Sequence, residues 1–138
     1  MIVLDTNVLS EPLRAAPNPA VMNWLAVNPV AIVTAISVGE VLSGVARMPD
    51  GNRKARLALA IDAAIAHADV LPYDAEAARV FGDVHSSRRL MGRPLSVEDG
   101  MIAAICISRN ATLATRNVKD FVGLDLELVN PWGDDREA

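Results

Sequence analysis

The chain opens with Ile2-Val3-Leu4-Asp5-Thr6-Asn7, a short apolar run that ends at an aspartate. An uninterrupted apolar run of this length is typical of a strand buried on both faces, as in a parallel sheet. Two later stretches also carry an acidic residue where a helix starts: Ser37-Val38-Gly39-Glu40 follows the apolar residues 30–35, and Ser96-Val97-Glu98-Asp99 opens an apolar helix. Each acidic residue therefore lies at a junction between elements.

The rest of the chain predicts an alternation of strands and helices. Strands are predicted at residues 2–4, 30–35 and 112–115, with a short extended piece at 70–71 and an edge strand within 124–128. A single helical turn is predicted before Pro12, and a helix from Pro19 through Leu25 that ends before Pro29. Further helices are predicted at 37–47, 53–68, 75–90 and 97–108. Strands that alternate with helices predict an α/β fold with a small, mostly parallel sheet flanked by helices.

Size, charge and cysteine content narrow the class of protein. The 138 residues predict one domain spanning 1–138. A net charge of −4 argues against a strongly basic protein that coats nucleic acid without specificity. The only cysteine, Cys106, lies in an apolar helix, which excludes an internal disulfide, predicts a packing role and fits a cytoplasmic protein. No apolar stretch approaches the roughly 18 residues of a membrane span.

The three acidic residues Asp5, Glu40 and Asp99 allow two interpretations. Each can cap or complement a helix start, as in the capping-box patterns Ser37…Glu40 and Ser96…Asp99. Alternatively, the carboxyl ends of parallel strands meet at one edge of a sheet, where distant carboxylates can surround one hard cation. No basic residue adjoins any of the three in sequence, which favours the cation. A cation held there suggests phosphodiester chemistry.

A family resemblance runs nearly end to end along the chain. The features that carry it are residues 2–8, Glu40, Asp99 ahead of Ile102-Ala103-Ala104, Leu113-Ala114-Thr115-Arg116-Asn117 with Asp120-Phe121, and Asn130-Pro131-Trp132. Together they resemble the PIN-domain ribonucleases of the kind that serve as VapC-type toxins in type II bacterial toxin–antitoxin pairs. The resemblance implies a PIN-like three-layer fold and a metal-dependent endoribonuclease.

The resemblance also assigns roles to single residues. Asp5, Glu40 and Asp99 match the family acids that bind Mg²⁺ or Mn²⁺ and orient a water for attack on RNA. Many family members have a further aspartate directly after Thr-Arg, where this chain has Asn117; the nearest acid is Asp120, one helical turn on. The sequence leaves open which of these two completes the site, and whether one or two metal ions bind.

Four polar residues beside these acids are predicted to orient the substrate or an acid: Thr6, Asn7, Thr115 and Arg116. We assign Thr115 to an acid and Arg116 to a phosphate, with a solvated side chain as the alternative for Arg116. The two histidines, His67 and His85, lie in helical stretches without a nearby nucleophile, and a surface or packing role is predicted for both.

Candidate contacts with partners are less specific. The basic residues 53–56, and Arg88-Arg89 with Arg93, could contact RNA, although such charge runs also occur on solvated helix faces. The resemblance implies a homodimer and a cognate antitoxin with a segment in a groove near the acids. Apolar residues that could line such surfaces, with core burial as the alternative, are Val8, Leu9, Leu13, Trp24 and Val41.

Two other functions compete with the nuclease. One is a catalytically silent binding module of the same fold, in which the acids act only as caps and no metal binds. The other is a phosphotransfer enzyme with Asp5 as nucleophile, for which the chain offers no convincing second acid or downstream lysine. The sequence does not identify the RNA, its cleavage sequence or the antitoxin.

Overall fold

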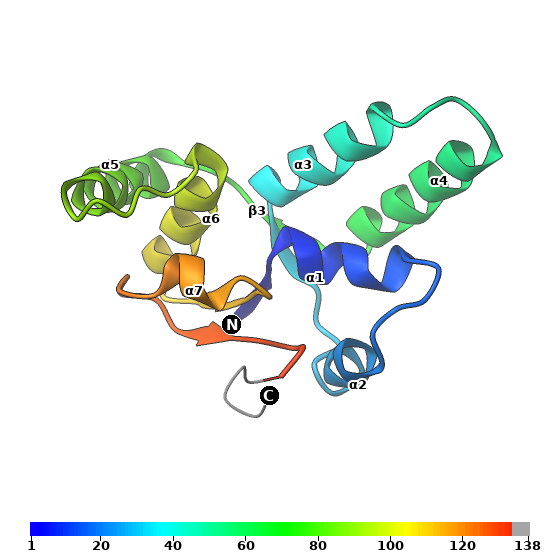
Figure 1. Cartoon of the computed structure of the whole chain (residues 1–138), viewed down its shortest axis with the longest axis horizontal. Coiled ribbons are helices and arrows are strands. Elements are labelled where there is room, and N and C mark those ends of the chain that lie inside the picture. Colours follow the sequence, from blue (N-terminus) through cyan, green and yellow to red (C-terminus); the bar gives the residue numbers. More distant parts are fainter. Residues whose placement is uncertain (134–138) are drawn as a thin grey trace.

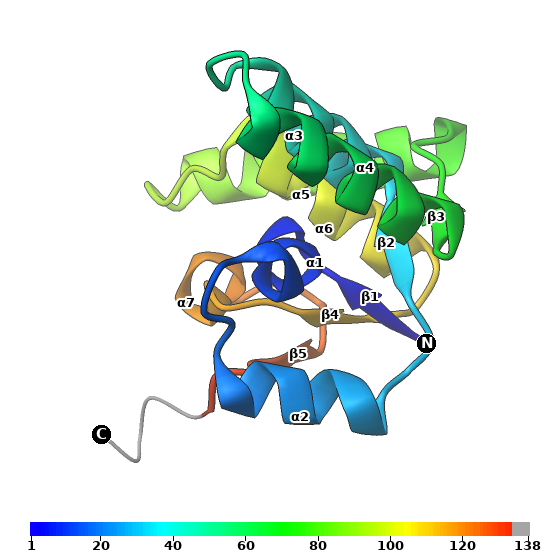
Figure 2. The same cartoon turned by 90° about the vertical axis from the view of Figure 1, so that its right-hand side faces the viewer.

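A computed structural model of the chain describes residues 1–133 (Figure 1). Its strands are short and pair in parallel throughout: β1 (Ile2–Leu4), β2 (Ile32–Thr34), β3 (Asp69–Leu71), β4 (Thr112–Ala114) and β5 (Leu128–Val129). They form one sheet of order β1-β4-β5 and one of order β2-β3. Figure 2 shows β2 next to β1, so the two sheets continue one another. The predicted α/β class with a small parallel sheet is confirmed.

Helices surround these strands. They are α1 (Thr6–Ser10), the 3₁₀ helix η1 (Glu11–Leu13), α2 (Pro19–Val27), α3 (Ala35–Ala46), α4 (Asn52–Ala66), α5 (Ala75–Leu90), α6 (Val97–Ser108) and α7 (Val118–Phe121). In Figure 1, α3 and α4 lie side by side on the right, whereas α5, α6 and α7 gather on the left. No helix within residues 1–133 is long and apolar enough to cross a membrane.

Local sequence signals explain several helix boundaries. Asn18 caps α2 by accepting a hydrogen bond from the Ala20 N–H at 2.8 Å, and Pro19 occupies the first helical position. Ser96 caps α6 by accepting a hydrogen bond from the Asp99 N–H at 3.1 Å. The predicted limits of α5 are those observed. These boundaries were predictable because a cap is a contact between residues close in sequence.

The start of α3 differs from the prediction. We expected Ser37 to cap this helix, but the helix begins at Ala35 and Thr34 is its cap. The Thr34 Oγ1 accepts a hydrogen bond from the Ser37 N–H at 3.1 Å. The capping box of Ser37 and Glu40 is therefore wrong. Because Thr34 both ends β2 and caps α3, Glu40 lies in the second turn of the helix, where no cap is needed.

Two predicted strands are shorter in the structure. The strand expected at residues 30–35 covers only Ile32–Thr34, and the edge strand expected within 124–128 is Leu128–Val129. Residues Leu124 and Leu126 precede this strand but still pack against the apolar core. Their alternation with acidic residues thus reports burial of one side of the chain and not a ladder of strand hydrogen bonds.

The strands separate two apolar clusters. Val3 and Leu113 belong to one cluster, whereas their neighbours Leu4 and Ala114 belong to the other, because successive strand residues point to opposite faces. The first cluster includes Ile102, Ala103, Cys106 and Phe121 from α6 and α7. The second includes Val8, Leu9, Val41, Val45 and Ile61 from α1, α3 and α4. Helices therefore cover both faces of the sheet, as a three-layer fold requires.

Several residues considered for other roles lie in this core. Cys106 is fully buried, and burial raises the pKa of its thiol to about 12, so it packs as an inert apolar group. Val8, Leu9 and Val41 are buried in the core, which was the alternative to a role in a partner surface. Leu13 and Trp24 are partly buried against the same cluster.

The cap of α3 gives a stability prediction. Replacing Thr34 with Val keeps the branched shape but removes the hydroxyl that accepts from Ser37 N–H, and we expect the free energy of unfolding to fall by about 1 kcal/mol. Urea denaturation measures this change. The control Thr112→Val removes one long surface hydrogen bond, to Glu127, and should change stability by less than about 0.5 kcal/mol. Equal effects of the two substitutions would contradict Thr34 as the cap.

Candidate active site

The three predicted acids come from three different elements. Asp5 directly follows β1, Glu40 lies in α3 and Asp99 in the first turn of α6. Burial raises the pKa of each carboxyl group. The charge of Asp5 raises the pKa of Glu40 and of Asp99 further, and Asp99 does the same to Glu40. The fold thus brings the three carboxylates, far apart in sequence, into one electrostatic site.

Asp5 is the most constrained of the three. It is 4% exposed, its Oδ1 accepts a hydrogen bond from the Thr6 N–H at 2.8 Å, and its Oδ2 accepts one from the Thr115 Oγ1 at 2.7 Å. The first contact makes Asp5 the N-cap of α1. The second joins β1 to the residue that follows β4. Asp5 is therefore both a cap and a fixed carboxylate at the end of the sheet, which are compatible roles.

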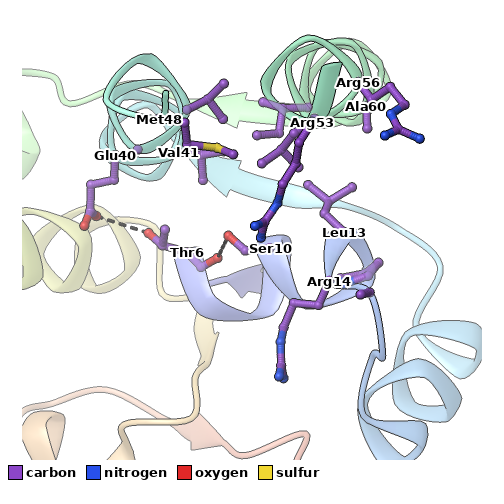
Figure 3. A pocket seen from close by; sticks show the side chains of 16 residues that line it. Thr6, Ser10, Leu13, Arg14, Glu40, Val41, Met48, Arg53, Arg56 and Ala60 are labelled. Atoms are coloured by element: carbon purple, nitrogen blue, oxygen red, sulfur yellow. Dashed lines mark hydrogen bonds between the residues drawn. The ribbon is translucent and has the colours of Figure 1, made fainter. Parts of the chain in front are cut away.

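Glu40 is held by a hydrogen bond from Thr6. The Thr6 hydroxyl donates to Glu40 Oε1 at 3.1 Å (Figure 3). It also lies 2.9 Å from the Ser37 Oγ. Thr6 is the first residue of α1, so this contact links α1 to α3 beside Asp5. The Thr6 hydroxyl thus holds a carboxylate, and its predicted role in orienting the substrate stays a prediction. The buried Ser37 could not be predicted as a partner of Thr6 from the sequence, because only the fold brings α1 and α3 together.

The donor set fits a hard divalent cation. It consists of carboxylate oxygens, and none of the three acids pairs with Lys, Arg or His within residues 1–133. In the same part of the chain, no group of three or more Asp, Glu, His or Cys side chains is placed so that it could hold a metal ion together. Mg²⁺ does not need such a set, because it keeps several waters and takes one or two carboxylates from the protein.

The two candidates for a fourth acidic position have different environments. The Asn117 N–H donates to Thr115 Oγ1 at 3.1 Å and so supports the hydroxyl that holds Asp5. The charge of Asp120 raises the pKa of Asp99, and the two acids line one polar cleft of about 470 Å³. Asp120, in α7, is thus the residue that adds negative charge near Asp99, although Asn117 occupies the position expected from the resemblance.

Asn7 and Arg116 contact each other across the loop after β4. The Asn7 Oδ1 accepts a hydrogen bond from the Arg116 N–H at 3.3 Å, so Asn7 fixes the backbone that follows Thr115. The Arg116 guanidinium lies over the ring of Trp132, 5.2 Å from its centre. Arg116 is therefore an exposed side chain that also packs on an aromatic face.

The remaining candidates divide into packing residues and surface residues. His85 stacks on Phe81 with ring centres 5.0 Å apart, and His67 ends α4. Arg88, considered either as an RNA contact or as part of a solvated helix face, is buried at 3% exposure. Its Nε donates to the Arg93 carbonyl at 2.8 Å and its Nη1 to the Val122 carbonyl at 3.3 Å. The interpretation of Arg88 as part of a solvated helix face is therefore wrong.

A groove of about 1010 Å³ opens beside Glu40 and Thr6 (Figure 3). It lies between α1 and η1 on one side and α3 and α4 on the other, and its apolar lining includes Leu13, Val41 and Met48. From the basic stretch at residues 53–56, Arg53 and Arg56 line this groove. Lys54 instead pairs with Asp50 at 3.1 Å.

Comparison with known proteins agrees with this architecture. The family model of the PIN domain matches residues 2–124. The chain belongs to the PIN-domain family. Among PIN-domain proteins, it is 34% identical to the VapC ribonuclease Y4jK of Sinorhizobium fredii over 96% of this chain and 98% of that protein. It is 35% identical to the toxin FitB of Neisseria gonorrhoeae over 97% of this chain and 100% of that protein.

Solved structures give the same result. This PIN domain superposes on the structure of FitAB bound to an IR36 DNA fragment with a TM-score of 0.86 and 35% identity, covering 98% of both chains. VapBC2 from Rickettsia felis, bound to a promoter DNA fragment, matches with a TM-score of 0.82 at 24% identity, which supports the fold. The recognition of a VapC-type PIN domain from the sequence is confirmed.

The raised pKa values predict how pH affects stability in the absence of metal. The ordinary values are 3.8 for Asp and 4.5 for Glu, and the folded values of Asp5, Glu40 and Asp99 lie above them. Between the ordinary and the raised values, the folded protein binds more protons than the unfolded chain. The contribution of these groups to stability is therefore greatest at low pH and is lost as pH rises through the raised values.

Asp99→Asn should consequently raise the melting temperature of the metal-free PIN domain at neutral pH and flatten this pH dependence, because it removes a half-buried charge that repels Asp5. Thermal melts from acidic to neutral pH measure the effect. Asp83→Asn, at an exposed position of α5, serves as the control and should leave the profile unchanged. A lower melting temperature for Asp99→Asn would show that the carboxylate acts mainly as a stabilising cap.

Proposed function

We propose that this PIN domain is a metal-dependent endoribonuclease that acts as the toxin of a toxin–antitoxin module. The observation that carries the proposal is the buried Asp5, fixed through both oxygens and coupled to Glu40 and Asp99 without any basic partner in residues 1–133. Related proteins bear the names VapC ribonuclease and tRNA(fMet)-specific endonuclease VapC, which supports cleavage of RNA.

In this proposal, Asp5, Glu40 and Asp99 hold Mg²⁺ or Mn²⁺. Such a cation lowers the pKa of a bound water and offsets charge on the phosphate as the bond to phosphorus forms. The other groups of the site hold the carboxylates in place: Thr115 donates to Asp5, and Thr6 donates to Glu40. Because these hydrogen bonds already fix the two carboxylates, the side chains would need little reorganisation when a cation binds.

The test combines metal binding with RNA cleavage. We expect Mn²⁺ to bind the purified protein without its antitoxin. Asp5→Asn and Asp99→Asn should each lower kcat for RNA cleavage by at least about 100-fold, because each removes a carboxylate that supports charge in the transition state. Calorimetric titration of Mn²⁺ and a cleavage assay on the same samples measure both. The exposed Asp83→Asn is the control for loss of one negative charge.

Two outcomes would contradict the proposal. A folded wild-type protein that neither binds Mn²⁺ nor cleaves RNA would support the alternative, a catalytically silent PIN module in which the acids only cap helices. Cleavage that persists in Asp99→Asn would show that the reaction does not depend on the carboxylate of α6.

The fourth acidic position has its own test. We propose that Asp120 supplies this charge, because it acts on Asp99 across their shared cleft, while Asn117 supports Thr115 through its backbone. Asp120→Asn should therefore reduce cleavage by roughly 10- to 100-fold, as expected for an outer carboxylate near a metal. Asn117→Ala, which keeps the backbone N–H, should change it much less. The reverse order of effects would assign the role to Asn117.

We further propose an antitoxin as the protein partner and RNA as the substrate of a cytoplasmic homodimer. The solved structures named FitAB and FitAcB, at 34–35% identity, support a toxin–antitoxin partnership. The groove between α1 and the α3–α4 pair is the surface that we assign to the antitoxin, since it is largely apolar and ends at Thr6 and Glu40 (Figure 3). An occupant of this groove would reach the proposed metal site.

A further inference from the structure

A second cleft lies next to the acids, on the side of the molecule away from the groove. It has a volume of about 470 Å³ and is bounded by the end of α5, the turn that follows it, the start of α6 and α7. These elements lie together on the left of Figure 1. The charged and polar residues that line this cleft are Arg88, Arg93, Ser96, Asp99, Lys119 and Asp120.

Arg88 is the unusual member of this set. Its side chain is buried at 3% exposure, yet it pairs with no carboxylate within residues 1–133. Its hydrogen bonds to the carbonyls of Arg93 and Val122 use two of the five N–H donors of a guanidinium. Burying a cation without a counter-ion is costly, so an anion in the cleft would complete its environment.

Two further cations border the same cleft. Arg93 and Lys119 are exposed and form no ion pair with the described residues. The Arg88 bond to the Arg93 carbonyl fixes the turn that carries Arg93, and its bond to the Val122 carbonyl anchors the chain just after α7, which carries Lys119. The buried guanidinium thus also positions the two exposed cations around the cleft.

We propose that this cleft binds a backbone phosphate of single-stranded RNA that neighbours the phosphate to be cleaved. The proposal rests on the proposed nuclease function, because Asp99 and Asp120 line the cleft together with the three cations. An RNA strand that crosses Asp99 has to place its next phosphate close beside it, and each phosphate carries the negative charge that Arg88, Arg93 and Lys119 attract. An acidic protein segment would also supply negative charge, but its carboxylates are not covalently joined to the phosphate that is cleaved at Asp99.

The test substitutes the exposed cations, because substitution of the buried Arg88 would also remove its hydrogen bonds to two backbone carbonyls and could unfold the protein. The double variant Arg93→Gln/Lys119→Gln is compared with Arg47→Gln/Arg79→Gln, which removes the same charge from exposed positions at the end of α3 and in α5, outside the cleft. Fluorescence anisotropy in EDTA reports binding of a labelled single-stranded oligoribonucleotide without cleavage. A salt series gives the number of neutralised phosphates from the slope of log K against log salt.

We expect the cleft variant to bind RNA about tenfold more weakly, and its salt slope to be shallower by roughly 0.7 for each phosphate that the variant no longer neutralises. The control variant should bind like wild type. In Mn²⁺, the cleft variant should raise KM while kcat stays close to the wild-type value, because the cations attract this phosphate equally in the ground state and the transition state.

Unchanged affinity and slope in the cleft variant, equal losses in both variants, or no binding by wild type would overturn the proposal. Weaker binding of polyglutamate with unchanged RNA binding would assign the cleft to an acidic protein segment and would also overturn it. Failure of the nuclease proposal is distinguishable: RNA affinity would depend on Arg93 and Lys119 in EDTA, but no cleavage would follow on adding Mn²⁺.

Discussion

The hydrogen bond from Thr115 to Asp5 is the contact on which the candidate site depends. It joins the ends of the neighbouring parallel strands β1 and β4, and its 2.7 Å length and full burial make it strong where water cannot compete. Asp5 at the same time caps α1, whose first residue, Thr6, holds Glu40. One buried carboxylate thus coordinates the position of two strands and two helices around the proposed cation site.

This arrangement concentrates negative charge at a cost in stability. Burial and mutual repulsion raise the pKa values of Asp5, Glu40 and Asp99, so the ionised forms are less stable here than in water. Carboxylates with no basic partner among residues 1–133 are typical of functional sites, where a ligand supplies the opposite charge, rather than of structural ion pairs. Positive groups line the two hollows beside the acids: Arg53 and Arg56 in the groove, and Arg88, Arg93 and Lys119 in the cleft.

The two hollows beside the acids differ in chemistry, and the difference follows from the elements that form them. The larger one lies between helices that turn apolar residues such as Leu13 and Val41 toward it, which suits a protein segment. The smaller one is formed by helix ends and a turn, where charged residues gather and backbone carbonyls bind Arg88. The proposed roles of antitoxin groove and RNA subsite rest on this contrast.

The order of residues along the chain was enough to predict the alternation of strands and helices, the caps at Asn18 and Ser96, and the positions of Asp5 and Asp99 at element junctions, because periodicity and capping depend on residues close in sequence. The same reasoning placed the start of α3 at Ser37, since it could not show that Thr34 both ends β2 and caps the helix. Only the tertiary structure paired Thr6 with Glu40 and buried Arg88, because these contacts join residues 34 positions apart and follow from how helices pack around the sheet.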